Sequence, residues 1–357
     1  MNPCGRLIFN VITALAGALL MPGATAQLLD ESQEMARAKL IVGPENGEND
    51  CSSCHSLEHE AWQTTRHYAT FKDRHRSKEA KKILANLGKK SMKRISECRQ
   101  CHYTTIIKRG KLRAAWGVSC ESCHGPAKRW LDIHNRPGGN PEADALEWGE
   151  GRKESPSAHT ARLDAAAAKG MLHPARLYDI AANCFGCHTV PDEHLVNVGK
   201  HHSGKDFELV ARSQGEIRHN FVSSNTAPDH PGNRPASIAE LRRLYVVGAL
   251  VDLEYSVRNL AHAQQADGAF YQAMLKRVNK VRGRVQGLLK RVQLPGVSAA
   301  LAKIPQSVTK SAQVSDAMAD GLQAAARAFV KENDGSTLAG LDAELPKKYD
   351  GDAYQPQ

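Results

Sequence analysis

Large side chains and long apolar runs are both scarce in this chain of 357 residues. Aromatic residues make up only 5% of it, so few bulky groups are available to fill a hydrophobic core. We therefore expect something other than side chains to fill part of the interior. The apolar run at 7–20 has 14 residues, fewer than the roughly 20 that a membrane-spanning helix needs, and no later stretch replaces it. The sequence also lacks an acid–base constellation that would name an enzyme substrate.

The N-terminus has the layout of a secretory signal peptide. Arg6 precedes the apolar run 7–20, and the small residues at 24–26 offer a cleavage site before Gln27. The alternative is a retained membrane anchor, which the shortness of the run disfavours. We predict that the signal peptide, residues 1–26, is removed and that the mature protein is soluble in the periplasm.

No cysteine of the predicted mature chain lies outside one repeated pattern. Cys4 precedes the apolar run, so it leaves with the signal peptide and does not indicate a lipoprotein. The other eight of the nine cysteines form four C-x-x-C-H motifs. These are Cys51-Ser52-Ser53-Cys54-His55, Cys98-Arg99-Gln100-Cys101-His102, Cys120-Glu121-Ser122-Cys123-His124 and Cys184-Phe185-Gly186-Cys187-His188.

The pattern C-x-x-C-H is the attachment signature of c-type haem. Two thiols one helical turn apart each bond a vinyl group of one porphyrin, and the next residue places its imidazole under the iron. Zinc sites and disulfides are the alternatives, but zinc does not require His directly after every second Cys, and a disulfide within C-x-x-C closes a strained loop. We predict four covalently bound haem c groups, whose proximal iron ligands are His55, His102, His124 and His188.

Each haem iron takes a second axial ligand or keeps that face open for chemistry. Sixteen histidines less the four in the motifs leave twelve, and there are only 7 methionines, so the second ligands are predicted to be histidines. His67 follows His55 by 12 residues, and a helix over 57–68 would carry it about 18 Å away. We therefore expect His67 to serve a neighbouring haem, and His134, ten residues after His124, to do the same.

Two segments resemble the tetrahaem cytochrome c-554 family, known from ammonia-oxidising bacteria as electron acceptors of hydroxylamine oxidoreductase. The first motif, followed by Trp62, Thr65 and His67, is similar to the family's first haem segment. The run Gly117-Val118-Ser119 before the third motif, Gly125-Pro126 after it, and His134 beyond are similar to the family's third segment. The fourth motif keeps only the order and the approximate spacing.

This resemblance implies second ligands for three of the four irons. It implies that His134 caps the haem of His55 and that His67 caps the haem of His124. A histidine upstream of the last motif caps the fourth haem in the family, and His173 is the nearest match here.

The second haem is five-coordinate in the family, which implies that the iron of His102 is open to small ligands such as nitric oxide. This sequence offers three further distal candidates beyond the matched region, namely His201, His202 and His219. An open iron would bind a small ligand, whereas a capped iron would only relay electrons. The sequence is compatible with both arrangements.

The predicted fold class is mainly α, with a multihaem cytochrome c domain that has little regular sheet and a C-terminal helical hairpin or bundle. The tetrahaem domain is placed at 27–234, with a surface loop at 137–156 and a linker at 220–235 that are rich in glycine and proline. The helical domain is placed at 235–335, and a polar tail at 336–357.

Three helices are predicted in the C-terminal domain. Ser237 and Glu240 form a capping-box signature before the apolar-periodic run 238–260. A second helix is predicted to begin near Ala269 and to be broken at Pro295-Gly296. A third is predicted over 307–330.

Acidic residues are absent from 269–292, although this segment carries seven basic ones. Such a segment could dock a redox partner protein that is acidic or membrane-associated, and the alternative is a solvated helix face. Nucleic acid is not a predicted partner, because the propionates of four haems add about −8 charges and offset most of the net charge of +10.

Two functions are compatible with the sequence. The favoured one is electron transfer between redox partners by a periplasmic tetrahaem c-type cytochrome, in which the protein supplies ligands, spacing and electrostatics. The alternative is a redox enzyme that acts on a small nitrogen or sulfur compound at a five-coordinate haem. No catalytic residue is predicted.

Overall fold

The computed structural model describes residues 28–45, 47, 50–135, 154–204, 207–221, 232–309 and 313–356. The predicted signal peptide, most of the predicted loop 137–156 and the centre of the predicted linker 220–235 lie outside these residues. Within them the chain is mainly helical, with one two-stranded sheet, so the predicted fold class is confirmed. No described helix is both long enough and apolar enough to span a membrane.

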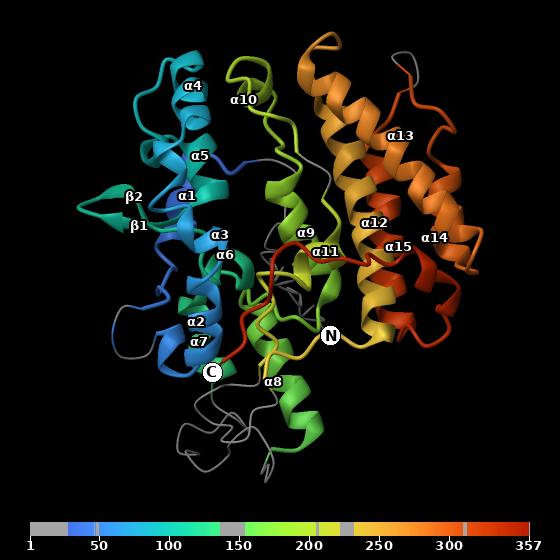
Figure 1. Ribbon diagram of the computed structural model, residues 1–357, viewed down its shortest axis with the longest axis horizontal. Coiled ribbons are helices and arrows are strands. Elements are labelled where there is room, and N and C mark those ends of the chain that lie inside the picture. Colours follow the sequence, from blue (N-terminus) through green and yellow to red (C-terminus); the bar gives the residue numbers. More distant parts are fainter. Residues whose placement is uncertain are drawn as a thin grey trace, which may run out of the picture.

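The haem half, which we define as residues 28–221 and name after the four predicted haem motifs in it, is built of short helices and turns (Figure 1). Few of these helices exceed nine residues, because capping residues and glycines interrupt the chain often. In chain order the elements are α1 (Glu31–Ala38), η1 (Cys51–Ser53), α2 (Ser56–Gln63), α3 (Arg66–Ala69), η2 (Arg74–Arg76), α4 (Lys78–Asn86), η3 (Met92–Arg94), α5 (Ser96–His102), β1 (Thr104–Lys108), β2 (Lys111–Trp116), α6 (Cys120–His124), η4 (Ala127–Arg129), α7 (Leu131–His134), α8 (Pro156–Ala168), α9 (Leu177–His188), α10 (Glu193–Asn197) and α11 (Leu209–Ser213).

The β1–β2 hairpin brings the second and third motifs together. Its turn residues Arg109 and Gly110 both have positive φ, 53° and 71°, the twist that a tight two-residue hairpin turn needs. At the open end, the Thr104 hydroxyl lies 2.8 Å from the hydroxyls of both Ser119 and Ser122. The residues on either side of the hairpin are therefore neighbours in space.

The helical half, which we define as residues 232–356, contains α12 (Ile238–His262), α13 (Ala269–Leu289), α14 (Pro295–Ala302) and α15 (Asp316–Glu332). The predicted capping box is present, since the Ser237 hydroxyl accepts from the Glu240 N–H and the Glu240 carboxylate accepts from the Ser237 N–H. The second helix ends at Leu289, before the predicted break at Pro295-Gly296. This proline starts α14, because the first helical turn does not require the missing N–H.

Helix α12 is the centre of the helical half, and every residue from Tyr245 to Val257 is buried. It packs against α13, α15 and α9, and these helices share one continuous apolar core (Figure 1). A helix that is buried on all sides is typical of the centre of such a cluster. Its buried Asp252 pairs with Arg277 of α13 at 2.6 Å.

The predicted polar tail folds onto both halves. It opens with the 3-10 helix η6 (Ala339–Glu344), where Leu338 and Leu341 are buried. The chain then crosses back to the haem half (Figure 1), where the Asp350 carboxylate pairs with Arg66 at 2.9 Å and also with Arg212. The two halves are thus joined by α9 and by the end of the chain.

Candidate metal centres

All four C-x-x-C-H motifs lie in or against helical turns. The first starts at η1, α6 is the third motif itself, and α5 and α9 end with the second and the fourth. Thiols three residues apart on a helix lie on one face, about 5–6 Å apart between their Cβ atoms. All eight described cysteines are free of disulfides. Each motif therefore presents two thiols and an imidazole to the same side.

Every motif histidine faces one histidine from a distant part of the chain. A transition metal held at about 2 Å by one nitrogen of each of two facing imidazoles leaves the ring centroids about 6 Å apart. All four pairs fall at this separation. The centroid distances are 6.3 Å for His55–His134, 6.5 Å for His102–His201, 6.0 Å for His124–His219 and 6.2 Å for His67–His188.

Backbone carbonyls orient four of these rings through Nδ1. The Nδ1 atom lies 3.0 Å from the Leu172 oxygen in His124, 2.8 Å from the Leu131 oxygen in His134, 2.7 Å from the His202 oxygen in His201, and 2.7 Å from the Ile217 oxygen in His219. A neutral imidazole that donates from Nδ1 turns the lone pair of Nε2 outward, which is how second partners orient metal-binding histidines.

Burial keeps five of the eight paired imidazoles neutral, which is the form that binds a metal. Loss of hydration lowers the pKa of His102 and of His188 to about 3. The same cause lowers the pKa of His124 and of His134 to about 4. Burial also lowers the pKa of His67.

The thiols show how the four motifs are grouped. The side chains of Cys101 and Cys187 are within hydrogen-bonding contact, and so are those of Cys51 and Cys120. The second motif therefore adjoins the fourth, and the first adjoins the third. Burial raises the pKa of the Cys98 thiol to about 12, as expected for sulfur that lies in the interior.

The residues that carried the family resemblance hold His67 in place. Thr65 caps α3 by accepting from the Tyr68 N–H at 3.1 Å, and the Trp62 indole donates to the Val118 oxygen at 2.8 Å. A Cβ on Gly117 would lie 2.3 Å from the His67 oxygen, so only glycine lets the two segments approach this closely.

Two pairings implied by the resemblance differ from the structure. His67 faces His188 instead of His124: the Val118 N–H ties its backbone oxygen to the segment before the third motif, while its ring lies against the ring of the fourth motif. His124 faces His219. His134 lies opposite His55, the arrangement that the resemblance implies.

His173 does not face the fourth motif. It lies four residues before the start of α9, whereas His188 is the last residue of that helix, and the 11 steps from Leu177 to His188 rise about 16 Å. The His173 Nδ1 accepts from the Ala175 N–H at 3.2 Å, and the preceding Leu172 binds His124. The segment of His173 therefore supports the third motif.

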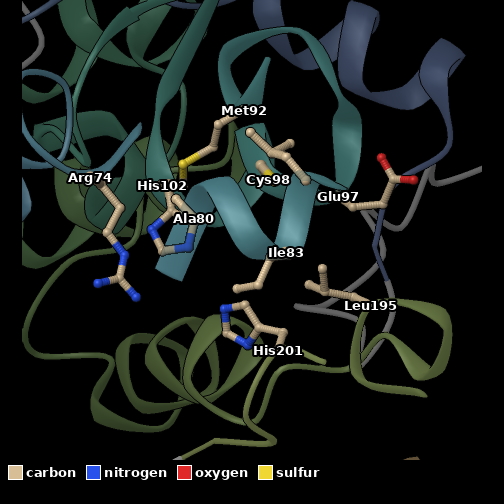
Figure 2. A pocket seen from close by; sticks show the side chains of 10 residues that line it. Arg74, Ala80, Ile83, Met92, Glu97, Cys98, His102, Leu195 and His201 are labelled. Atoms are coloured by element: carbon tan, nitrogen blue, oxygen red, sulfur yellow. The ribbon is translucent and has the colours of Figure 1, made fainter. Parts of the chain in front are cut away.

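The second motif faces a second imidazole as well. His102 and His201 border a small, mostly apolar slot that Ala80, Ile83 and Met92 also line (Figure 2). His201 is set by a tight turn, in which Lys200 has a φ of 60° and the His201 N–H donates to the Leu195 oxygen at 3.1 Å. This arrangement differs from the open iron that the resemblance implies.

His202, which was also a candidate second ligand for the iron of His102, lies at the surface. Its ring is exposed and lies on His201, with the ring centroids 4.6 Å apart. Of the two adjacent histidines, the structure thus brings His201 into ring contact with His102. Neighbours in sequence point to different sides of an extended segment, and no local pattern distinguishes which of the two histidines would face the motif.

The donor set fits haem c better than a bare metal ion. The described residues contain no group of three or more His, Cys, Asp or Glu side chains that could hold an ion. Two facing imidazoles would supply only two ligands to a metal ion, and a porphyrin would supply the others. The paired thiols beside each motif histidine have the spacing that thioether bonds to one porphyrin need.

Comparison with known proteins agrees with this chemistry. Residues 50–125 match the family described as cytochrome c554 and c-prime. This segment of the chain is therefore similar to the cytochrome c-554 family. Cytochrome c-554 of Nitrosomonas europaea is 29% identical over 103 residues, which are 27% of this chain and 44% of that protein. The resemblance to this family that the motifs indicate is therefore confirmed.

The c-554-like segment covers the first three motifs and little else. The chain spans less than half the length of the curated relative it matches. The fourth motif, the facing histidines His134, His201 and His219, and the whole helical half lie beyond residues 50–125. No solved structure matches the chain.

Proposed function

We propose that this chain is an exported, periplasmic electron carrier with four covalently bound haem c groups, each iron held between two histidines. The observation that supports it is the set of four ring pairs at 6.0–6.5 Å, one for each C-x-x-C-H motif. The proximal ligands are the motif histidines. The distal ligands are His134 for His55, His201 for His102, His219 for His124 and His67 for His188.

The chain's residues would tether, orient and desolvate these groups. The eight thiols would form the thioether bonds, and the carbonyls that accept from Nδ1 would hold four of the rings in register. Bound haem supplies an iron that gains and loses one electron, and two histidine ligands favour lower potentials than a histidine–methionine pair. The groups would relay electrons between redox partner proteins.

The grouping of the motifs supports a relay. Contact between Cys101 and Cys187 and between Cys51 and Cys120 puts the motifs of different haems against each other. A ligand for each motif comes from another segment, so the haems and the chain would form one cluster. Electron transfer along such a cluster needs no open coordination position.

The first test is a count of haems and of their ligation states. Intact mass is expected to exceed that of the chain without its signal peptide by four haems, and the EPR spectrum of the oxidised protein is expected to show four low-spin irons that do not bind nitric oxide. A high-spin iron that binds nitric oxide would contradict the proposal and support the alternative, an enzyme acting on a small nitrogen or sulfur compound.

Two adjacent histidines provide a matched pair of variants. His201→Ala is expected to convert one haem to a high-spin form that binds nitric oxide, because it removes the ring that faces His102. His202→Ala removes the exposed neighbouring ring and is expected to leave all four irons low-spin. If the two variants give the same spectrum, the assignment of His201 is wrong.

A further inference from the structure

The positive charge of this protein is concentrated beside one of the four centres. Residues 72–94 contain ten Lys and Arg against two Asp and Glu, a net charge of +8, whereas the whole chain has +10. This segment comprises η2, α4, η3 and the turns that join them. Basic and acidic residues are thus nearly equal in number in the remaining 334 residues.

The charges lie on the outward side of the segment. Eight cations are exposed and form no ion pair with any described residue, namely Lys72, Arg76, Lys78, Lys81, Lys82, Lys89, Lys90 and Arg94. Of the two acidic residues, Glu79 pairs with Arg74 at 3.3 Å. Figure 1 shows α4 at the far edge of the haem half, away from α12–α15. We call this surface the α4 face.

The inward side of the same helix closes the slot between His102 and His201. Ala80, Ile83 and Leu84 are buried and line it together with Met92 (Figure 2). Helix α4 therefore presents its apolar stripe to the slot and its charged stripe to solvent, the usual division of an amphipathic helix. A partner held at the α4 face would be one helix away from the second haem.

The other basic segment, 269–292, was identified from the sequence. Most of its cations form contacts within the protein. Arg277 pairs with Asp252 at 2.6 Å and Arg284 lies 3.9 Å from the same carboxylate. Arg282 is buried and donates to the Ile304 oxygen, and Arg291 pairs with Glu344 at 2.5 Å. Arg277, Arg282, Arg284 and Arg291 are thus paired within the protein, so this segment is the weaker docking surface.

We propose that the α4 face is the docking surface for an acidic redox protein, which exchanges electrons with the haem of His102. This rests on the proposed function. Complementary charge steers diffusing partners and raises association rates about 10- to 1,000-fold, and transient redox complexes have small interfaces. Among the residues that the structure describes, the large exposed apolar side chains are Val198, Ile238 and Tyr349, and none of these is on this face. A surface with charge and no apolar anchor suits a brief protein encounter better than membrane insertion.

The test uses reduced flavodoxin, an acidic flavin protein, as the electron donor. Its hydroquinone would give one electron to a ferric haem and become the semiquinone, and stopped-flow absorbance would follow both. The triple variant Lys81→Glu, Lys82→Glu, Lys89→Glu is expected to lower the second-order rate constant about tenfold or more at low ionic strength. The loss should shrink as salt is added, because screening weakens the steering.

A matched triple variant gives the control. Lys276→Glu, Lys290→Glu and Lys303→Glu change the net charge equally at exposed sites of the helical half, and the rate is expected to stay within about threefold of the parent. Equal losses in both variants would show that only net charge matters, and no loss in the first would overturn the proposal. So would binding of anionic vesicles that depends on the α4 face while the flavodoxin rate does not. Reduction by dithionite is measured on every variant, and its failure would instead contradict the proposed function.

Discussion

The haem half and the helical half differ in the size of their hydrophobic cores. In the haem half, the buried apolar clusters are small, one around Ala80, Leu84 and Met92 and one around Ala127 and Trp130. A single large cluster fills the helical half and also takes in residues of α9, α10 and α11 from the haem half. The difference supports the proposal that haems complete the interior of the first half, while side chains alone fill the second.

The largest effect is expected from preventing haem attachment. Changing all eight motif cysteines to alanine should unfold most of the haem half, because ligand binding and folding are coupled where few side chains are buried. Hydrogen exchange should show protection lost in α5 and α6 and retained in α12 and α15. Equal protection of α5 in the haem-free and haem-bound proteins would contradict the comparison.

A cavity in the helical half is expected to have the next largest effect. Leu250→Ala removes a side chain with 0% exposure from α12 and should lower the free energy of unfolding by about 2–5 kcal/mol. Denaturant unfolding monitored by circular dichroism would measure it. Ile238→Ala, at a site that is 49% exposed in the same helix, is the control and should change stability by less than about 0.5 kcal/mol.

A buried carboxyl in the helical half should make stability depend on pH. Burial raises the pKa of Glu254 to about 7 from the ordinary 4.5, although the Tyr178 hydroxyl donates to it at 2.9 Å. The native state then holds a proton that the unfolded chain has lost, so the free energy of unfolding falls as pH rises from about 4.5 to about 7, by up to about 3 kcal/mol.

Glu254→Gln should remove that part of the pH dependence. Urea unfolding at pH 5 and pH 8 would measure it, and the variant is expected to gain on the parent at pH 8 relative to pH 5. The exposed Glu332→Gln is the control and should keep the parent's profile. If Glu254→Gln keeps it too, the carboxyl ionises without cost in the native state.

The smallest effect is expected from removing a hydrogen-bonded contact between the two halves. Asn197, just before the turn of His201, accepts from the Phe270 N–H of α13 at 2.9 Å and donates to Gln265 at 3.1 Å. Asn197→Ala should loosen that turn by about 1 kcal/mol and give a minor high-spin fraction at the second haem. Optical titration with nitric oxide would detect it.

Gln272→Ala gives the control for this contact. Gln272 is exposed on the same helix and donates to Ala266, away from the turn. It should leave nitric oxide binding unchanged. A larger uptake in Gln272→Ala than in Asn197→Ala would mean that α13 does not hold the turn through Asn197.

Several elements followed directly from local sequence. The capping box at Ser237 and Glu240 fixed the start of α12, and α13 begins at Ala269 as predicted, because both signals depend on residues within one turn. The third predicted helix starts at Asp316 instead of 307, and α14 was missed, since proline reads equally well as a breaker and as a first helical residue.

The four C-x-x-C-H motifs are a property of the sequence alone, because five consecutive residues bring two thiols and an imidazole to one side of a helical turn. Which histidine faces which motif is a property of the tertiary structure. His67 lies beside His188, and His201 beside His102, through contacts between segments more than 90 residues apart in sequence. Facing positions depend on packing that no local pattern records. The same holds for the basic residues, whose run in α13 is largely paired internally while those of α4 face solvent.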